Sequence, residues 1–197
     1  MPRTLVTTPR KKAGQTRSAD TIKVILEAAA RILEERGLAG YNTNAIAERA
    51  GVSIGSLYQY FPNKHAITRA LIERFEREML GACEVAARAA KGLPLADATA
   101  LLVGVVVDQH GARPTLNRIL EDEEARLFGD APENGGARNF VEAFLEPYRA
   151  QIAAPLDEVA RDVLTVARAL ADATLREGSS RADSERRIGR AISGCLG

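Results

Sequence analysis

The chain has few of the residues on which most metal and enzymatic sites depend. Its 197 residues include no tryptophan, only two cysteines and only two histidines. Cys83 and Cys195 stand far apart, and no cysteine or histidine pair has the spacing of a zinc site. We therefore predict no metal and no cofactor, and we expect a reducing compartment because cysteine is so scarce.

Long hydrophobic runs are also missing. The longest aliphatic stretch, residues 101–107, contains a glycine and is much shorter than the roughly 20 apolar residues that a membrane-spanning helix needs. The N-terminal residues are charged but are not followed by the apolar segment of a secretory signal. These absences predict a cytoplasmic protein with no membrane partner.

The charge of the chain is balanced overall but uneven along its length. The formal net charge is +1, yet residues 1–80 carry 13 basic and 8 acidic side chains, whereas residues 81–197 carry 14 and 18. This asymmetry suggests that only the front half faces a polyanion such as DNA. A chance distribution in a neutral protein is the alternative explanation.

The spacing of apolar residues predicts an all-α protein of about nine helices. Apolar side chains recur every three or four residues from Thr21 onward, and no segment alternates convincingly as a β-strand. Ser18 or Asp20 can cap the first helix, and Gly37 can end it. Residues 1–18 carry basic side chains and no acid, and we expect a disordered basic arm that either solubilises the chain or contacts DNA.

Residues 46–64, with the sequence IAERAGVSIGSLYQYFPNK, have the pattern of a helix-turn-helix. Ala47 is small where two helices must approach closely, and Gly51 can adopt the positive φ of a tight turn. Ser53 can cap the second of the two helices, and Thr43 the first. We therefore predict a three-helix DNA-binding domain over residues 19–64.

The second helix of this motif presents small and neutral side chains that can enter a major groove, and hydroxyl and ammonium groups flank it. Tyr58 and Tyr60 are two residues apart, so they point to different sides of the helix. We favour a phosphate contact more strongly for Tyr60 than for Tyr58, and a partly buried structural ring is the alternative for each. The predicted DNA-binding residues are Thr43, Ser53, Ile54, Gly55, Ser56, Tyr58, Gln59, Tyr60 and Lys64.

The segment resembles the DNA-binding domain of the TetR family of bacterial repressors. The resemblance covers about residues 22–75 and departs from the family pattern at His65, where a glutamate is common. Beyond this region the chain agrees with the family only in length, helical content and helix order. The matching positions are Thr43, Ile46, Ala47, Ala50, Gly51, Val52, Ser53, Gly55, Leu57, Tyr58, Tyr60, Phe61 and Lys64.

The resemblance implies a homodimeric repressor that binds a palindromic DNA operator and is released by a small-molecule effector. It implies that residues 65–197 form a helical effector-binding and dimerisation domain. Because the candidate pocket residues are mostly apolar, we expect a largely apolar effector, although ordinary core packing is the alternative for each of them. The candidates are Cys83, Val103, Val107, His110, Leu116, Leu120, Phe128, Phe140, Phe144 and Tyr148.

The helix that follows Pro155 carries a broad apolar stripe, which fits the helix-paired dimers of the family. Its predicted interface residues are Val159, Val163, Ala167, Leu170 and Thr174.

Two other functions compete with a ligand-responsive repressor. One is an architectural DNA-binding protein that has no effector. The other is a helical enzyme, which is weakly supported because the chain has no paired histidine and carboxylate motif, no glycine-rich phosphate loop and no metal spacing. We therefore predict that the protein is not an enzyme.

Overall fold

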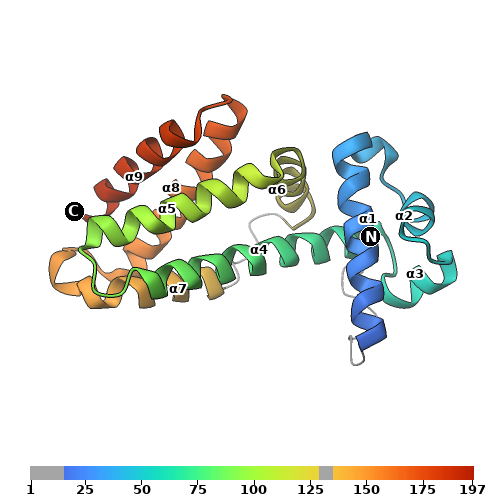
Figure 1. Ribbon diagram of the computed structural model, residues 1–197, viewed down its shortest axis with the longest axis horizontal. Coiled ribbons are helices and arrows are strands. Elements are labelled where there is room, and N and C mark those ends of the chain that lie inside the picture. The colour runs from blue at the N-terminus through green and yellow to red at the C-terminus, as the bar shows by residue number, and fades with distance from the viewer. Residues whose placement is uncertain (1–15, 129–134) are drawn as a thin grey trace, which may run out of the picture. The chain divides into compact units, whose positions relative to one another are not determined.

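The computed structural model describes residues 16–128 and 135–197, and it places the side chains of residues 18–127 and 135–197. Every regular element of this part of the chain is a helix (Figure 1), which confirms the predicted all-α class. Residues 1–15, most of the predicted basic arm, lie outside the described residues. The elements are α1 (Thr16–Gly40), α2 (Thr43–Ala50), α3 (Ile54–Tyr60), α4 (Lys64–Ala89), α5 (Leu95–Ala112), α6 (Pro114–Phe128), α7 (Gly135–Leu145), the 3₁₀ helix η1 (Glu146–Gln151), α8 (Leu156–Arg176) and α9 (Arg181–Leu196).

The described helices form two compact units, each with its own hydrophobic core. The N-terminal unit contains α1–α3, α4 up to Phe75, and α6; the C-terminal unit contains the rest of α4 with α5, α7, η1, α8 and α9. This division differs from the predicted boundary between residues 64 and 65. Helix α6 joins the N-terminal unit because Leu116 and Leu120 are buried in its core.

One face of α1 builds the core of the N-terminal unit. Ile25, Ala29 and Ile32 are almost completely buried, at the three- and four-residue spacing of an amphipathic helix. Burying an isoleucine or leucine side chain stabilises a fold by about 1.5–3 kcal/mol. Helix α1 is therefore the platform on which the shorter helices rest. Their buried contributions to the same core include Ile46, Leu57, Phe61, Ile67 and Leu71.

Helix α1 is longer than the sequence predicts. It begins at Thr16, so neither Ser18 nor Asp20 is its cap. Gly37 has the predicted left-handed backbone, with φ 59°, but helical structure resumes and continues to Gly40. Because a glycine adopts positive φ without a side-chain clash, α1 kinks at this position instead of ending there.

The short helix α2 starts one residue earlier than predicted. The Asn42 Oδ1 atom accepts a hydrogen bond from the Ala45 N–H at 3.0 Å, so Asn42 caps α2. Thr43, the predicted cap, is instead the first residue of the helix. Its hydroxyl is therefore available for a contact other than capping.

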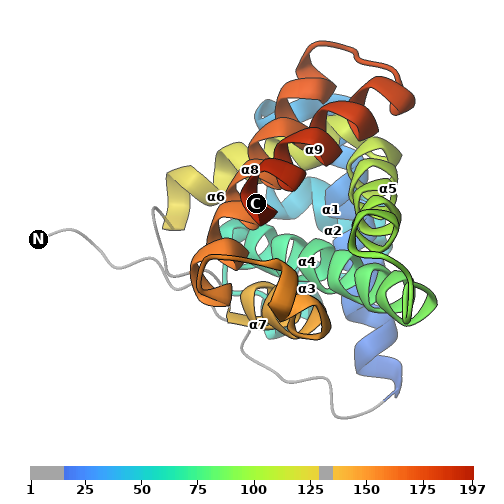
Figure 2. The ribbon, with the colours of Figure 1, turned by 90° about the vertical axis from the view of Figure 1, so that its left-hand side faces the viewer.

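In the C-terminal unit, α8 and α9 pack against each other and against α5, and α7 packs on α8 (Figures 1 and 2). Ser180 caps α9, because its Oγ accepts a hydrogen bond from the Asp183 N–H at 3.2 Å. Gly111 lies inside α5, and α7 is followed directly by η1. The core includes Val103, Val159, Ala160, Ala171, Ile188 and Ile192.

Candidate nucleic-acid interface

Helices α2 and α3 are joined by the tight turn that a helix-turn-helix requires. Gly51 has φ 67° and ψ 28°, the left-handed conformation predicted for it. The Val52 N–H donates to the Ala47 carbonyl at 3.0 Å and closes the end of α2. Ser53 then caps α3, since its Oγ accepts a hydrogen bond from the Ser56 N–H at 3.0 Å. The predicted turn and the predicted cap of α3 are both confirmed.

Helix α3 buries one face and exposes the other. Leu57 is fully buried in the N-terminal core, and Ala47 of α2 is almost fully buried in the same core. The opposite face carries the residues predicted to meet DNA bases. Ser53, Ile54, Gly55 and Gln59 are exposed, and Ser56 is half-buried with its hydroxyl 2.8 Å from that of Ser53. The exposed face of α3 thus carries no charged side chain.

The structure brings together two of the predicted phosphate-binding hydroxyls. The Thr43 Oγ1 atom at the start of α2 lies 3.1 Å from the Tyr58 Oη atom of α3, within hydrogen-bond distance. The Tyr58 side chain is 41% exposed, so both hydroxyls remain near the surface. Fifteen residues separate these two positions along the chain. Because each hydroxyl has a single proton, one of the two donates to the other, and the remaining proton is free to reach a phosphate oxygen.

Tyr60 is more deeply buried than its predicted role as a phosphate contact requires. Its ring is 9% exposed and belongs to the N-terminal core, whereas Tyr58 lies outside that core. The Tyr60 hydroxyl is 3.5 Å from the Ser18 Oγ of α1. Two residues along a helix correspond to a rotation of about 200°, so one ring faces inward when the other faces outward. The structure therefore favours Tyr58 over Tyr60 as a phosphate contact, and Tyr60 has mainly a packing role.

Lys64 is the first residue of α4 and is exposed, and the backbone of this turn is held by hydrogen bonds from within the unit. The Asn63 Oδ1 atom accepts a hydrogen bond from the Ala66 N–H at 2.9 Å. The Lys64 carbonyl accepts hydrogen bonds from the Thr68 hydroxyl at 3.1 Å and the Tyr41 hydroxyl at 3.5 Å. Sequence reasoning missed Tyr41 and Thr68, and only the placement of Thr68 one helical turn after Lys64 could have suggested one of these bonds.

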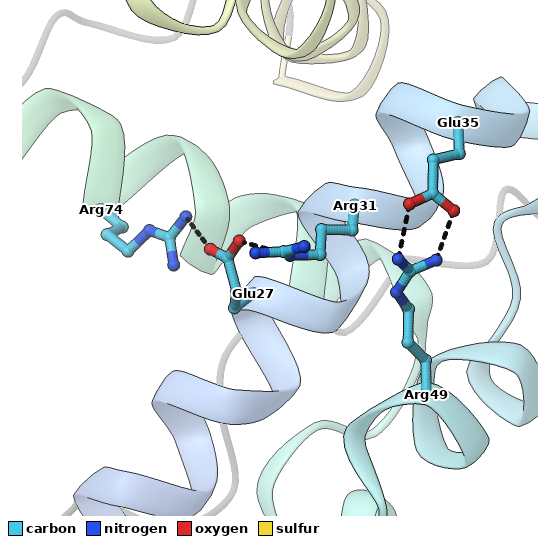
Figure 3. A network of polar contacts seen from close by, with 5 residues as sticks. All are labelled: Glu27, Arg31, Glu35, Arg49 and Arg74. Atoms are coloured by element: carbon cyan, nitrogen blue, oxygen red, sulfur yellow. Dashed lines mark hydrogen bonds and ion pairs between the residues drawn. The ribbon is translucent and has the colours of Figure 1, made fainter.

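Ion pairs connect α1 to α2 and to α4 (Figure 3). The Arg49 guanidinium donates two hydrogen bonds of 2.5 Å to the Glu35 carboxylate, and this pairing holds the pKa of Glu35 below its usual value. Glu27 lies between two arginines, at 3.0 Å from Arg31 and 3.7 Å from Arg74. These contacts were not predicted from the sequence. They are surface pairs whose chief effect is to orient the helices, because exposed ion pairs contribute little stability.

The predicted effector-pocket residues do not form one group. Leu116 and Leu120 are 4% exposed and belong to the N-terminal core, so their assignment to a pocket in the C-terminal domain was wrong. They were misplaced because α6 packs on the N-terminal unit. Phe128 lies outside the residues whose side chains are described. The remaining candidates fall in the C-terminal unit: Cys83, Val103, Val107, His110, Phe140, Phe144 and Tyr148.

Three aromatic rings of this set form a row on α7 and η1. The ring centres of Phe140 and Phe144 are 6.4 Å apart, and those of Phe144 and Tyr148 are 6.1 Å apart. The Tyr148 hydroxyl donates to the Leu93 carbonyl at 2.9 Å. All three rings are partly buried and pack against the C-terminal core. Aromatic side chains of this kind are common in the binding sites of hydrophobic ligands.

Cys83 and His110 are both buried in the C-terminal unit. His110 is buried, its Nδ1 lies 2.9 Å from the Val106 carbonyl, and burial lowers its pKa. Burial raises the pKa of the Cys83 thiol to about 11, so this cysteine is an inert thiol at neutral pH.

A surface hollow of about 350 Å³ is lined by Ser179, Asp183, Arg186, Arg187 and Arg190, none of which belongs to the predicted set.

Part of the predicted dimer interface faces the interior of the protomer. Val159 and Thr174 are 2% and 3% exposed, and the Thr174 hydroxyl donates to the Ala171 carbonyl at 3.0 Å. Assigning these two residues to a subunit interface was therefore wrong. Val163, Ala167 and Leu170 are partly buried and pack against the same core. The apolar stripe of α8 is needed inside its own chain, where it contacts α5, α7 and α9.

Two further expectations concern metals and membranes. Within residues 16–128 and 135–197, no group of three histidine, cysteine or acidic side chains is arranged to hold a metal ion. None of the helices described here is long and apolar enough to span a bilayer.

Known proteins share this arrangement. A family model described as bacterial regulatory proteins of the tetR family matches residues 25–71, which include α2, α3 and the turn between them. The nucleoid occlusion factor SlmA of Actinobacillus pleuropneumoniae is 30% identical over 120 residues, which cover 61% of this chain and 56% of that protein. The transcriptional repressor KstR of Mycolicibacterium smegmatis is 40% identical over 65 residues, or 32% of each chain. The chain thus spans about half or less of the length of these relatives.

Solved structures extend the likeness beyond the helix-turn-helix. A protein crystallised to explain the control of antibiotic production by a bacterial hormone has a TM-score of 0.71 and 20% identity, over 90% of this chain and 97% of that one. The SmeT–triclosan complex has a TM-score of 0.62 and 20% identity, over 90% of each chain. At these identities the likeness shows that the folds are the same.

Proposed function

The chain belongs to the TetR family of bacterial transcriptional regulators, and we propose that it is a repressor that binds a palindromic DNA operator as a homodimer and is released by a small-molecule effector. The observation that carries the proposal is the exposed face of α3, flanked by the Thr43–Tyr58 hydroxyl pair and by Lys64. Small polar side chains on this face can reach base edges while the flanking groups bind phosphates.

The proposed dimer uses the side of α8 that does not pack into the protomer core. Val166 and Ala173 are partly exposed and Ala169 is exposed, and none of the three belongs to the hydrophobic core. Their spacing of three and four residues places them on one side of the helix. Because these side chains are small, a second copy of α8 can approach closely. Two copies of α3 related by a two-fold axis would then match the two halves of a palindrome.

The proposed effector is a small, largely apolar molecule bound in the C-terminal unit. The support is the aromatic row of Phe140, Phe144 and Tyr148 together with the partly buried Val107. A protein of the same fold, SmeT, has been captured with the small molecule triclosan. Such an effector needs no cofactor and no catalytic group, in keeping with a regulator that is not an enzyme. A regulator of this kind works in the cytoplasm, where the DNA is.

The proposal is tested by sequencing the genomic fragments that the purified protein retains, with its own promoter included. We expect a short palindrome to be enriched. Lys64→Ala should weaken binding to all duplexes and lower the slope of log affinity against log salt by about one unit, because one phosphate contact is lost. A wild-type protein that retains no duplex even at low ionic strength would contradict the proposal.

A second candidate function is a chromosome-associated DNA-binding protein without an effector. The similarity to a nucleoid occlusion factor favours it, because the match covers 120 residues and so extends beyond the helix-turn-helix. The same sequencing experiment separates the two functions. Binding at a few promoters supports a repressor, whereas many sites spread over the chromosome support a structural role.

A further inference from the structure

Two buried hydroxyl groups meet the backbone of the first turn of α4. Tyr41, between α1 and α2, is 3% exposed, and Thr68 of α4 is 1% exposed. Their hydroxyl oxygens lie 3.2 Å apart. The Lys64 carbonyl oxygen lies 3.1 Å from the Thr68 hydroxyl and 3.5 Å from the Tyr41 hydroxyl. These three groups form a hydrogen-bonded triangle that joins two positions 23 residues apart in the chain.

Packing alone does not require a hydroxyl on the Tyr41 ring. The ring belongs to the N-terminal hydrophobic core, where a phenylalanine ring would have nearly the same shape. Burying a hydroxyl is unfavourable unless the group forms hydrogen bonds. Burial also raises the pKa of the Tyr41 hydroxyl, so the group keeps its proton and can donate it. The bonds to Thr68 and to the Lys64 carbonyl, which has two lone pairs to accept them, offset the cost of this burial.

Tyr41 also stands next to the start of α2. The following residue, Asn42, caps α2 through its Oδ1 atom, and Thr43 is the first residue of the helix. The Thr43 hydroxyl lies 3.1 Å from that of Tyr58 and belongs to the hydroxyl pair proposed to bind a phosphate. Lys64 carries the other proposed phosphate contact. A single buried side chain thus connects the segment that places Thr43 to the turn that places Lys64.

We propose that Tyr41 is a positioning residue for the DNA interface: its hydroxyl fixes the first turn of α4 against the segment that leads into α2, and so sets the place of the Lys64 ammonium relative to Thr43. This inference rests on the proposed DNA-binding function. The phosphates of a duplex stand at fixed spacings, and phosphate contacts fix the register of a protein on DNA. Two such contacts therefore assist each other only when the protein holds them at a matching distance.

The substitution Tyr41→Phe removes the hydroxyl and keeps the ring. We expect it to weaken binding to a mixed-sequence duplex about two- to tenfold, the lower part of the range of coupling between contacting residues. Fluorescence anisotropy measures the affinity, with a duplex of about 30 base pairs that holds two half-sites one helical turn apart. The temperature is chosen so that circular dichroism shows each protein to be folded. An affinity equal to that of the wild type overturns the inference.

The salt dependence and a double variant show whether the Tyr41 hydroxyl acts through Lys64. We expect the Y41F slope of log affinity against log salt to fall toward that of Lys64→Ala, which lacks the ammonium altogether. We also expect Y41F to cause no further loss of affinity when it is added to Lys64→Ala. A loss of stability alone leaves the slope unchanged and weakens both backgrounds equally. An unchanged slope, or losses that add in the double variant, contradicts the positioning role.

Substitutions of Thr68 test the same contact from α4 and do not depend on the folding of Y41F. Thr68→Ser keeps the hydroxyl and should bind duplex nearly as the wild type does, whereas Thr68→Val should bind as weakly as Y41F. Thr174→Val is the matched control, because Thr174 is a buried threonine of the C-terminal unit whose hydroxyl donates to the Ala171 carbonyl at 3.0 Å. It should lower the melting temperature and leave the affinity unchanged. Equal affinities of T68S and T68V would refute the role of the triangle.

The positioning role and the proposed function fail in different ways. If the wild-type protein binds duplex and both Y41F and T68V bind it equally well, only the positioning role is refuted. If the wild-type protein binds no duplex, the proposed function is refuted, and the positioning role with it.

Discussion

At the scale of single residues, backbone conformation at the tight turn depends on glycine. Gly51 has φ 67°. A Cβ atom added there would meet nothing within 4 Å, so a side chain is disfavoured by the backbone conformation and not by a clash with neighbouring atoms. For a residue with a side chain, the left-handed conformation is less favourable by about 1–2 kcal/mol of free energy.

We therefore predict that Gly51→Ala lowers the free energy of unfolding by about 1–2 kcal/mol. Gly111 is a matched control, because it is exposed inside α5 and an added Cβ atom would again meet nothing within 4 Å. Gly111→Ala should raise stability by about 0.5–1 kcal/mol, since alanine favours a helix. Denaturant unfolding measures both variants, and equal effects at the two sites would contradict the assigned role of Gly51.

The two histidines make stability depend on pH. Burial holds the pKa of His65 and of His110 below the usual 6.5, because it disfavours the charged imidazolium. The unfolded chain therefore binds protons more readily than the folded one. The stability from the neutral rings is fully present above pH 6.5 and is lost as the pH falls through the lower folded values.

We predict a lower free energy of unfolding at about pH 5 than at about pH 7.5, and a smaller difference in His65→Gln, which has no titrating ring at that position. Urea unfolding at the two pH values gives the comparison, with Asp122→Asn as a surface control. The explanation for His65 is wrong if H65Q keeps the full wild-type difference.

At the scale of elements, α3 combines two tasks on opposite faces. Leu57 and Tyr60 anchor the helix in the core, and Ser56 and Gln59 lie toward the surface that we propose to read bases. Substitutions on the second face should therefore change sequence preference without unfolding the unit.

We predict that Ser56→Ala and Gln59→Ala alter the enriched operator sequence more than they alter affinity for a mixed-sequence duplex. Tyr58→Phe is the matched contrast, because it removes a hydroxyl that we assign to a phosphate and should weaken binding to all duplexes alike. Fragment sequencing and anisotropy together measure the two effects. An unchanged operator in S56A and Q59A would assign base recognition to other residues.

At the scale of the whole molecule, α8 must serve the protomer core and, in our proposal, a second subunit. Val163 packs against the core of its own chain, whereas Ala169 is exposed and lies outside that core. The two positions thus separate folding from association.

We predict that Ala169→Glu yields a folded monomer that no longer binds a palindrome tightly, because a charge would be buried between two copies of α8. Val163→Glu should instead lower the melting temperature, since it places a carboxylate against the C-terminal core. Light scattering after gel filtration and thermal melting by circular dichroism distinguish the two results. A dimeric A169E protein would place the interface on another surface.

Local patterns in the sequence determined the helices, the turn at Gly51, the cap at Ser53 and the exposed face of α3. Each depends on residues within a few positions of one another, such as the apolar spacing of Ile25 and Ala29, so short-range physics is enough to predict it.

Only the tertiary structure decided which side chains from distant segments meet. It placed α6 with the N-terminal unit, turned Val159 and Thr174 into the protomer, and buried Tyr60 and Glu123. An amphipathic helix specifies that one of its faces is buried, but not which partner buries it. That choice depends on how all the helices share a limited core, which no single stretch of the sequence contains.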